Sequence, residues 1–120
     1  MYYICIMDIE INTTQMRKGV LELCILSIVS QQDAYTSDII GKLKTAQLIV
    51  VEGTLYPLLT RLKNEGLLSY RWEESTQGPP RKYYRITESG SKLLDLMKQD
   101  WLELVESVAR IIELKDENQL

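Results

Sequence analysis

Apolar side chains recur every three or four residues through the first half of the chain, which predicts helices. We expect Thr14 to cap a first helix over residues 16–32, whose apolar positions occupy two faces and predict burial on most sides. Residues 33–35 should be a short connector. Thr36 should then cap a second helix over residues 36–44.

A third helix follows, with leucines three or four positions apart along one stripe. This stripe consists of Leu55, Leu58, Leu59 and Leu62. Pro57 lacks an N–H and fits only the first turn of a helix, so we expect Thr54 to be the N-cap and Pro57 the third helical residue. Gly66 should end this helix in a left-handed conformation, and residues 46–51 should link it to the second helix.

The apolar period changes to two after the third helix, which is typical of strands. Leu68, Tyr70 and Trp72 share one face of the first strand, and residues 82–87 alternate in the same way. The intervening residues 75–81 have the composition of a loop. Together these segments predict a β-hairpin whose tip is the Gly-Pro-Pro sequence.

A last helix should begin at Thr87 and extend to about residue 115. Its apolar side chains form an uninterrupted heptad seam. The seam consists of Leu94, Met97, Trp101, Leu104, Val108 and Ile111. A helix of ~28 residues is ~42 Å long, more than a domain of this size can cover. We therefore expect much of the seam to bind a second copy in a symmetric homodimer. The alternative is packing within one chain, against the first helix and the N-terminal segment.

Three helices followed by a two-stranded hairpin is the order of a winged helix-turn-helix. The predicted fold class is mainly α (α+β), a winged helix-turn-helix with a long C-terminal dimerisation helix. We divide the chain into an N-terminal extension (1–13), a winged helix-turn-helix DNA-binding domain (14–86) and the C-terminal dimerisation helix (87–120). The extension has no assigned role, and its isoleucines suit either a short strand or an extra helical turn.

Composition removes several kinds of chemistry. The 120 residues include no histidine, and the two cysteines, Cys5 and Cys24, lie in apolar runs as packed thiols would. These facts exclude histidine-based hydrolysis and zinc-finger chemistry. We find no nucleophile with a paired base and no phosphate-binding loop, so we expect no enzyme activity, metal or cofactor. No apolar stretch is long enough to span a bilayer and the start of the chain lacks a secretory pattern, so we expect a cytoplasmic protein.

Charge is distributed unevenly along a chain whose formal net charge is −3. Residues 16–86 carry ten basic and seven acidic side chains, whereas residues 87–120 carry four basic and eight acidic ones. A basic middle segment attracts a polyanion, and the acidic end turns away from it.

The third helix is the first candidate surface for DNA. Its leucine stripe leaves Pro57, Thr60 and Asn64 on the opposite side, with Tyr56 and Arg61 beside them. Such a helix fits a major groove about 12 Å wide. Arg61 is suited to a phosphate or a guanine edge, and Tyr56 to a phosphate. The alternative is an amphipathic helix whose polar face contacts only water.

The end of the hairpin is the second candidate surface. Arg81, Lys82 and Arg85 follow the Gly-Pro-Pro sequence, and Gln77 precedes it. Cations at a rigid tip neutralise phosphates and release counterions, and Arg81 is best placed to reach into a minor groove. The alternative is an ordinary charged hairpin end, with Arg85 paired to one of the glutamates at 73–74 across the strands.

Trp101 fits two roles. A tryptophan in a helical seam packs in a core, but two such rings across a dimer axis can also stack on a small planar aromatic ligand, aided by the adaptable Met97.

Three segments resemble the PadR family of bacterial transcriptional regulators. They are MRKGVLELCILSIVS (16–30), EGTLYPLLTRLKNEGLL (52–68) and GPPRKYYRITESG (78–90), and the resemblance covers about residues 14–115. The short C-terminal part with one helix resembles the small subgroup of the family.

This resemblance implies a dimeric winged-helix repressor that binds a palindromic operator in double-stranded DNA. By position, it places Thr54, Tyr56, Pro57 and Arg61 in the recognition helix and Gly78, Arg81 and Lys82 in the wing. In small drug-responsive members a tryptophan lies on the C-terminal helix at the dimer interface, and Trp101 occupies a similar place.

We therefore expect a homodimeric, sequence-specific DNA-binding transcriptional regulator, a repressor that a small planar aromatic effector releases. The alternative is a protein-interaction adaptor that uses the winged helix as a scaffold and does not bind DNA.

Overall fold

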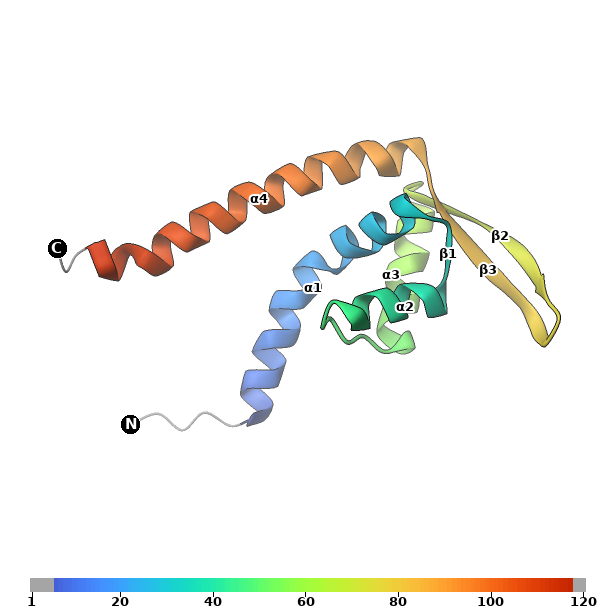
Figure 1. The fold of residues 1–120 in the computed structure, drawn as a ribbon, viewed down its shortest axis with the longest axis horizontal. Coiled ribbons are helices and arrows are strands. Elements are labelled where there is room, and N and C mark those ends of the chain that lie inside the picture. The colour runs from blue at the N-terminus through green and yellow to red at the C-terminus, as the bar shows by residue number, and fades with distance from the viewer. Residues whose placement is uncertain (1–5, 118–120) are drawn as a thin grey trace.

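The structure, a computed structural model, describes residues 6–117 as four helices and a small antiparallel sheet (Figure 1). In chain order the elements are α1 (Ile6–Gln31), β1 (Ala34–Tyr35), α2 (Thr36–Thr45), α3 (Glu52–Asn64), β2 (Leu68–Ser75), β3 (Gly78–Ile86) and α4 (Glu88–Glu117). The strands lie in the order β1-β3-β2. The predicted fold class is confirmed, because three helices, a hairpin and a long final helix follow one another as in a winged helix-turn-helix.

The hydrophobic core lies where α1, α2 and α3 meet one face of the sheet. Each helix buries apolar positions that its periodicity predicts, and each fully buried leucine or isoleucine contributes roughly 1.5–3 kcal/mol. The core side chains include Ile25 and Leu26 of α1, Ile39 and Leu43 of α2, Leu55, Leu59 and Leu62 of α3, and Leu68 and Tyr84 of the sheet. This packing fixes α3 relative to the hairpin.

The first helix begins earlier than predicted. α1 starts at Ile6, so the predicted cap Thr14 lies inside it. Residues 6–13 contain no proline or glycine, and nothing in them stops a helix. The described part of the expected extension is thus continuous with α1, while residues 1–5 lie outside the described residues.

α2 begins at Thr36, but its N-cap is Tyr35 rather than Thr36. The carboxylate of Asp38 accepts a hydrogen bond from the Tyr35 N–H at 3.0 Å. This bond satisfies a donor that the helix leaves free, and it places Asp38 at the positive end of the helix dipole as predicted.

α3 also begins earlier than predicted. Val51 is its N-cap, and the Val51 carbonyl accepts the N–H groups of Thr54 (3.0 Å) and Leu55 (3.1 Å). Pro57 is therefore the sixth helical residue rather than the third. A proline at that position leaves the Gly53 carbonyl without its helical donor. Gly53 and Pro57 are both exposed, so water can replace the missing bond.

Gly66 ends α3 with a φ of +76°, as predicted. The Gly66 N–H donates to the Lys63 carbonyl (3.0 Å), and the Leu67 N–H donates to the Leu62 carbonyl (2.9 Å). These two bonds form a Schellman motif, which leads the chain directly into β2.

The turn of the hairpin consists of Thr76 and Gln77, so the predicted Gly-Pro-Pro tip was wrong. Residues 78–80 are instead the first part of β3. The pairing passes from Glu73 and Arg81 to residues 75 and 78 with an irregularity between them. Both prolines lie in this irregular stretch, where the ladder does not need their N–H groups.

The predicted connector between α1 and α2 contains strand β1. Ala34 and Tyr35 pair with Tyr84 and Tyr83 of β3, respectively. This pairing attaches the end of α1 to the central strand, and two residues are too few to show a periodic pattern.

Thr87 caps α4 as predicted. Its hydroxyl accepts the Gly90 N–H at 3.0 Å and donates to the Gly66 carbonyl at 2.6 Å. Gly90 is buried, and a Cβ at this position would collide with the Leu67 carbonyl. The start of α4 is thereby held against the segment that joins α3 to β2.

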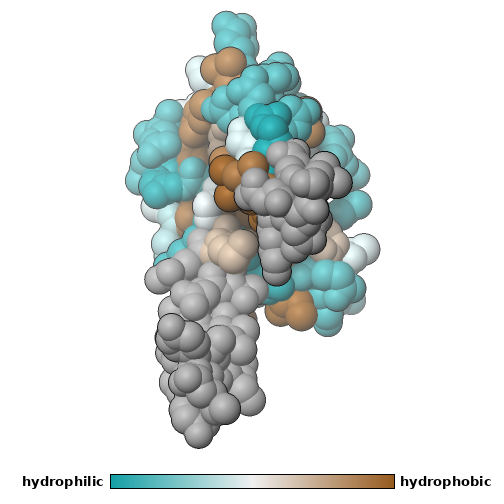
Figure 2. Space-filling model, turned by 90° about the vertical axis from the view of Figure 1, so that its left-hand side faces the viewer, coloured by the Kyte–Doolittle hydropathy of each residue, from teal (hydrophilic) through white to brown (hydrophobic). Residues whose placement is uncertain are grey.

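α4 extends well beyond the rest of the fold, away from the hairpin, so the molecule measures 63 × 34 × 23 Å (Figure 1). The predicted seam is divided along this arm: Leu94 is buried and Met97 packs against the core. The later seam residues Trp101, Leu104, Val108 and Ile111 are 42%, 55%, 46% and 68% exposed. Figure 2 looks toward this end of the molecule and shows hydrophobic patches open on its surface. Packing within one chain therefore covers only the start of the seam.

No helix among residues 6–117 is both long enough and apolar enough to cross a membrane.

Candidate nucleic-acid interface

α3 presents a polar face to solvent, opposite its buried leucines. Tyr56, Pro57, Thr60 and Asn64 are exposed, and together with Arg61 they border a shallow hollow. Hydroxyl, amide and guanidinium groups are the donors and acceptors that contact phosphates and base edges. The structure thus brings together the predicted residues of the third helix, apart from Thr54.

Arg61 lies at the edge of this face in an ion pair with Glu22 of α1. Its side chain remains 55% exposed, so a phosphate can still approach the guanidinium. No periodicity in the sequence indicates this pair, because Glu22 and Arg61 come together only through the packing of α1 against α3.

The two cations of the hairpin point to opposite faces, and neither lies at its tip. The Arg81 guanidinium stacks over the ring of Tyr35 at 4.3 Å from the ring centre. The Lys82 Nζ lies 4.5 Å from the ring centre of Tyr70 and 5.5 Å from that of Trp72. The prediction that Arg81 lies at the tip was wrong. Thr76 and Gln77 form the turn, and Arg81 lies inside strand β3.

One hollow of about 350 Å³ lies between the hairpin, the start of α2 and the start of α3. We call it the strand hollow. It is lined by Trp72, Pro80, Arg81 and Lys82 of the hairpin, Glu52 and Tyr56 of α3, and Tyr35, Thr36 and Ser37 at the β1–α2 junction. Predicted residues of the helix and of the hairpin therefore face one space, as a joint footprint on a nucleic acid requires.

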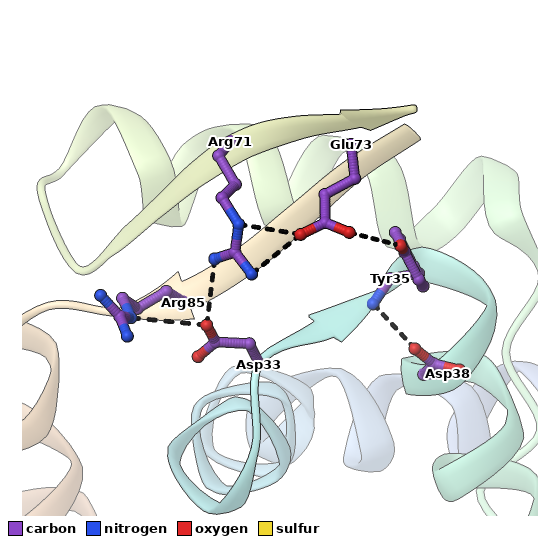
Figure 3. A network of polar contacts seen from close by, with 6 residues as sticks. All are labelled: Asp33, Tyr35, Asp38, Arg71, Glu73 and Arg85. Atoms are coloured by element: carbon purple, nitrogen blue, oxygen red, sulfur yellow. Dashed lines mark hydrogen bonds and ion pairs between the residues drawn. The ribbon is translucent and has the colours of Figure 1, made fainter. Parts of the chain in front are cut away.

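The other face of the sheet carries a polar network that joins the hairpin to β1 (Figure 3). Glu73 accepts hydrogen bonds from Arg71 Nε and from the Tyr35 hydroxyl, both at 3.0 Å. Asp33 pairs with Arg71 at 3.2 Å and with Arg85 at 3.4 Å. Arg85 is thus paired with Asp33 and not with a glutamate of β2, which corrects the alternative considered for it.

Stacked rings and cations reinforce the same connection. The rings of Tyr35 and Tyr83 lie 4.6 Å apart, and the Arg71 guanidinium lies 4.4 Å from the Tyr83 ring centre. With Arg81 over Tyr35, they form a stack in which two adjacent rings lie between two cations. This stack and the network connect the hairpin to β1 and to Asp33.

Two of these side chains have shifted pKa values. Burial, followed by the hydrogen bond to Glu73, raises the pKa of the Tyr35 hydroxyl, which keeps its proton for that bond. The hydrogen bond to Asp33 is the main cause that raises the pKa of Arg71.

Six of the nine predicted DNA-contacting residues lie outside the strand hollow. Pro57, Thr60 and Arg61 border the other hollow, on the exposed face of α3. Thr54 borders a different surface, next to Arg17 and Lys18 of α1. Gln77 and Gly78 lie at the exposed far end of the hairpin.

Six of the nine residues that line the strand hollow were not among the predicted site residues. Thr36, Ser37 and Pro80 are three of them, and the other three have aromatic or acidic side chains. Trp72 was placed on the face of Leu68 and Tyr70, which is correct, yet it is 62% exposed because the hairpin extends past the helices that cover that face. Glu52 belongs to the part of α3 that begins earlier than predicted, and Tyr35 to the unpredicted strand β1. Of these three residues, only Trp72 could have been found from the sequence, because it is an aromatic residue in a predicted strand next to a charged loop.

A family model described as "Transcriptional regulator PadR-like family" matches residues 25–96, which include α2, α3, the hairpin and the start of α4. The chain is also similar to three solved structures. A PadR-like transcription factor from Bacteroides fragilis is 62% identical, with a TM-score of 0.72 over 82% of this chain and 96% of that one. A PadR-like transcriptional regulator from Bacillus cereus strain ATCC 14579 is 41% identical, with a TM-score of 0.73 over 82% and 97%. A PadR family transcriptional regulator from Eggerthella lenta DSM 2243 is 30% identical, with a TM-score of 0.80 over 88% and 92%.

Proposed function

Because this chain belongs to the PadR-like family of transcriptional regulators, we propose that it is a homodimeric repressor that binds a specific, palindromic DNA sequence. Family membership establishes the broader role of a DNA-binding transcription regulator. The homodimer, the repression and the DNA-contacting residues are our proposal.

The strand hollow is the observation that supports the proposed DNA-binding surface. Tyr56 of α3 borders it on one side, and Arg81 and Lys82 of the hairpin border it on the other. A helix in a major groove and a wing at the neighbouring minor groove have to face the same side of a duplex. The residues we propose to contact DNA are Thr54, Tyr56, Pro57, Thr60, Arg61, Gln77, Gly78, Arg81 and Lys82.

The exposed part of the α4 seam supports the homodimer. An apolar stripe of this length in water is typical of an interaction surface, and its heptad spacing suits a helix of a second copy. Two copies joined through α4 present two α3 helices to the two halves of a palindromic site. The acidic side chains between the apolar ones keep this arm away from the duplex.

We also propose that a small planar aromatic effector releases the repressor. Trp101 is 42% exposed, one helical turn after the half-buried Met97, so its ring is available where the seam leaves the core. An effector bound between two such rings changes DNA affinity only if it favours one separation of the two DNA-binding domains over another.

Fluorescence anisotropy of labelled duplexes from the region upstream of the gene tests the DNA-binding surface at several salt concentrations. We expect affinity to fall steeply as salt rises. Arg81→Ala should weaken binding to every sequence and reduce the salt slope by about one unit. Lys44→Ala, which removes an exposed cation of α2 away from the strand hollow, should leave the slope unchanged.

The outcome of this experiment also separates the proposal from its alternative. A folded protein that gives no salt-dependent binding with any duplex would be an interaction adaptor on a winged-helix scaffold. An unchanged salt slope in Arg81→Ala would remove the hairpin from the DNA surface.

A further inference from the structure

We propose that the strand hollow holds one sugar-phosphate strand of the duplex, with the ring of Trp72 packed against a deoxyribose and Lys82 beside the adjoining phosphate. This inference rests on the proposed DNA binding. It adds a contact residue, Trp72, that neither the family resemblance nor the periodicity assigned to DNA.

Trp72 is a large apolar side chain that the fold leaves open. It is 62% exposed, although it shares a strand face with the buried Leu68 and the half-buried Tyr70. The ring of Tyr70 meets it edge to face at 6.0 Å, which fixes its orientation. A tryptophan side chain buries roughly 150–250 Å² when it finds a partner, so an oriented and exposed ring is a preformed contact.

The cations around Trp72 give the hollow the chemistry of a backbone site. The Lys82 Nζ lies near the rings of both Tyr70 and Trp72, and Arg81, whose guanidinium stacks over Tyr35, is another residue that lines the hollow. Stacking holds both cations in place before a ligand arrives, which reduces the entropy lost on binding. An apolar ring with a fixed lysine beside it matches the alternation of sugar and phosphate along a strand.

The two elements that form the walls of the strand hollow indicate that its occupant is a strand of duplex DNA. α3 forms one wall and is the element that enters a major groove, while the hairpin forms the other and lies at the minor groove. The strand that separates two neighbouring grooves has to pass between these elements. Thr36, Ser37 and Tyr56 line the hollow, and each carries a hydroxyl group that suits contacts with phosphate oxygens.

Glu52 sets the direction from which the phosphates approach. Among the described residues that line the strand hollow, it is the one with an acidic side chain. Its carboxylate repels phosphates, so they should lie on the hairpin side, near Arg81 and Lys82. Glu52→Gln should therefore tighten binding to every duplex by about two- to fivefold at low salt, and less as salt rises. A uniform loss of affinity in Glu52→Gln would contradict this placement of the strand.

Quenching of Trp72 fluorescence by acrylamide tests the contact directly. In a Trp101→Phe background, which keeps an aromatic ring in the seam, Trp72 is the single tryptophan of the chain. A random 25-base-pair duplex at low salt is the probe, because a backbone contact does not depend on sequence. We expect the quenching constant to fall at least about twofold on binding, since a deoxyribose then covers the ring.

Anisotropy of the same duplex, labelled and measured separately, reports binding independently. Binding by anisotropy without protection of Trp72 overturns the strand contact and leaves the proposed function intact. The absence of any anisotropy change overturns the proposed function itself, and the strand contact with it.

Salt dependence separates a ring contact from an effect on the neighbouring lysine. Trp72→Ala should weaken binding about fivefold or more with an unchanged salt slope, because it removes no charge. Lys82→Gln should reduce the slope by about one unit, and Trp72→Phe should retain most of the affinity. A reduced slope in Trp72→Ala would mean that the ring only positions Lys82, which contradicts the proposed contact. Circular dichroism checks the fold of each variant.

Discussion

Gly90 shows how a single missing Cβ positions the start of α4. A side chain here would collide with the Leu67 carbonyl and press on Ile86. We expect Gly90→Ala to lower the free energy of unfolding by about 1–3 kcal/mol, measured by urea denaturation. Gly41→Ala is the control, because a Cβ at that helical position meets no atom within 4 Å and should raise stability by about 0.5–1 kcal/mol. Equal unfolding free energies in the two variants would contradict the close packing of α4 against Leu67 and Ile86.

Cys24 is a half-buried thiol on α1, and burial raises its pKa above the usual range. The thiolate is the reactive form, so we expect alkylation of Cys24 by iodoacetamide at pH 8 to be slower in the native protein than in urea. The Cys5→Ser background isolates the signal, since the chain has two cysteines. Equal rates in native protein and in urea would show that the thiol is not packed.

The same shift links Cys24 to stability at high pH. Its pKa is higher in the folded than in the unfolded chain, so folding favours the protonated thiol. The contribution is complete below the unfolded pKa and is lost as pH rises through the folded value. Urea midpoints measured from pH 7 to 10 should therefore fall less in Cys24→Ala than in the parent.

The role of a single residue was predictable where it depends only on the local sequence. Gly66 and Thr87 were identified because a left-handed cap and a hydroxyl cap each depend on local chemistry. The ion pair of Arg61 with Glu22 was not, because it depends on how two helices pack.

Among the elements, the hairpin depends on its attachment to β1. Tyr35→Phe removes the hydroxyl that donates to Glu73 and keeps the ring beneath Arg81. We expect DNA affinity to fall about three- to tenfold with an unchanged salt slope, because the wing loses its angle but no charge. Anisotropy titrations over a range of salt concentrations measure both quantities.

Tyr83→Phe is the matched control for this variant. Its ring belongs to the same stack, and its hydroxyl makes no hydrogen bond within the described part of the chain. It should bind DNA like the parent. If Tyr35→Phe also binds like the parent, the network does not set the angle of the wing.

The elements themselves were predictable from their periods, and their ends much less so. Leucine spacing identified α3, but the Val51 carbonyl extends that helix by a turn that no apolar residue marks. Composition suggested a Gly-Pro-Pro tip, yet an irregularity in the ladder accommodates both prolines inside β3. Strand β1 was missed because two residues show no period.

The candidate site shows the same division. Tyr56, Arg81 and Lys82 were found because polar or cationic side chains on a helix and on a hairpin point to a polyanion. Their meeting at one hollow, and the presence there of Trp72 and Glu52, depend on the angle between α3 and the hairpin. That angle results from packing and from the network on the far face of the sheet.

At the scale of the whole molecule, the proposed homodimer depends on the exposed seam of α4. Val108→Glu places a charge in the middle of this seam. We expect it to raise the dimer dissociation constant at least about tenfold, measured by sedimentation equilibrium, because a buried carboxylate has no partner there. Gln99→Glu adds the same charge on the opposite side of the helix and should leave the dimer intact. A monomeric parent protein at micromolar concentration would contradict the homodimer.

If two copies join through α4 as proposed, dimerisation and DNA binding are coupled, because α4 sets the distance between the two DNA-binding domains. Val108→Glu should therefore also weaken binding to a palindromic duplex far more than binding to a single half-site. Equal losses on the two duplexes would mean that each head binds alone.

Hydroxyl-radical footprinting on a fragment selected from the source genome tests the two-headed DNA-binding surface most directly. We predict two protected patches on one side of the duplex, related by the symmetry of the site and separated by about 10–10.5 base pairs or a whole multiple of that distance. A single protected patch, or none on any selected fragment, would contradict the account.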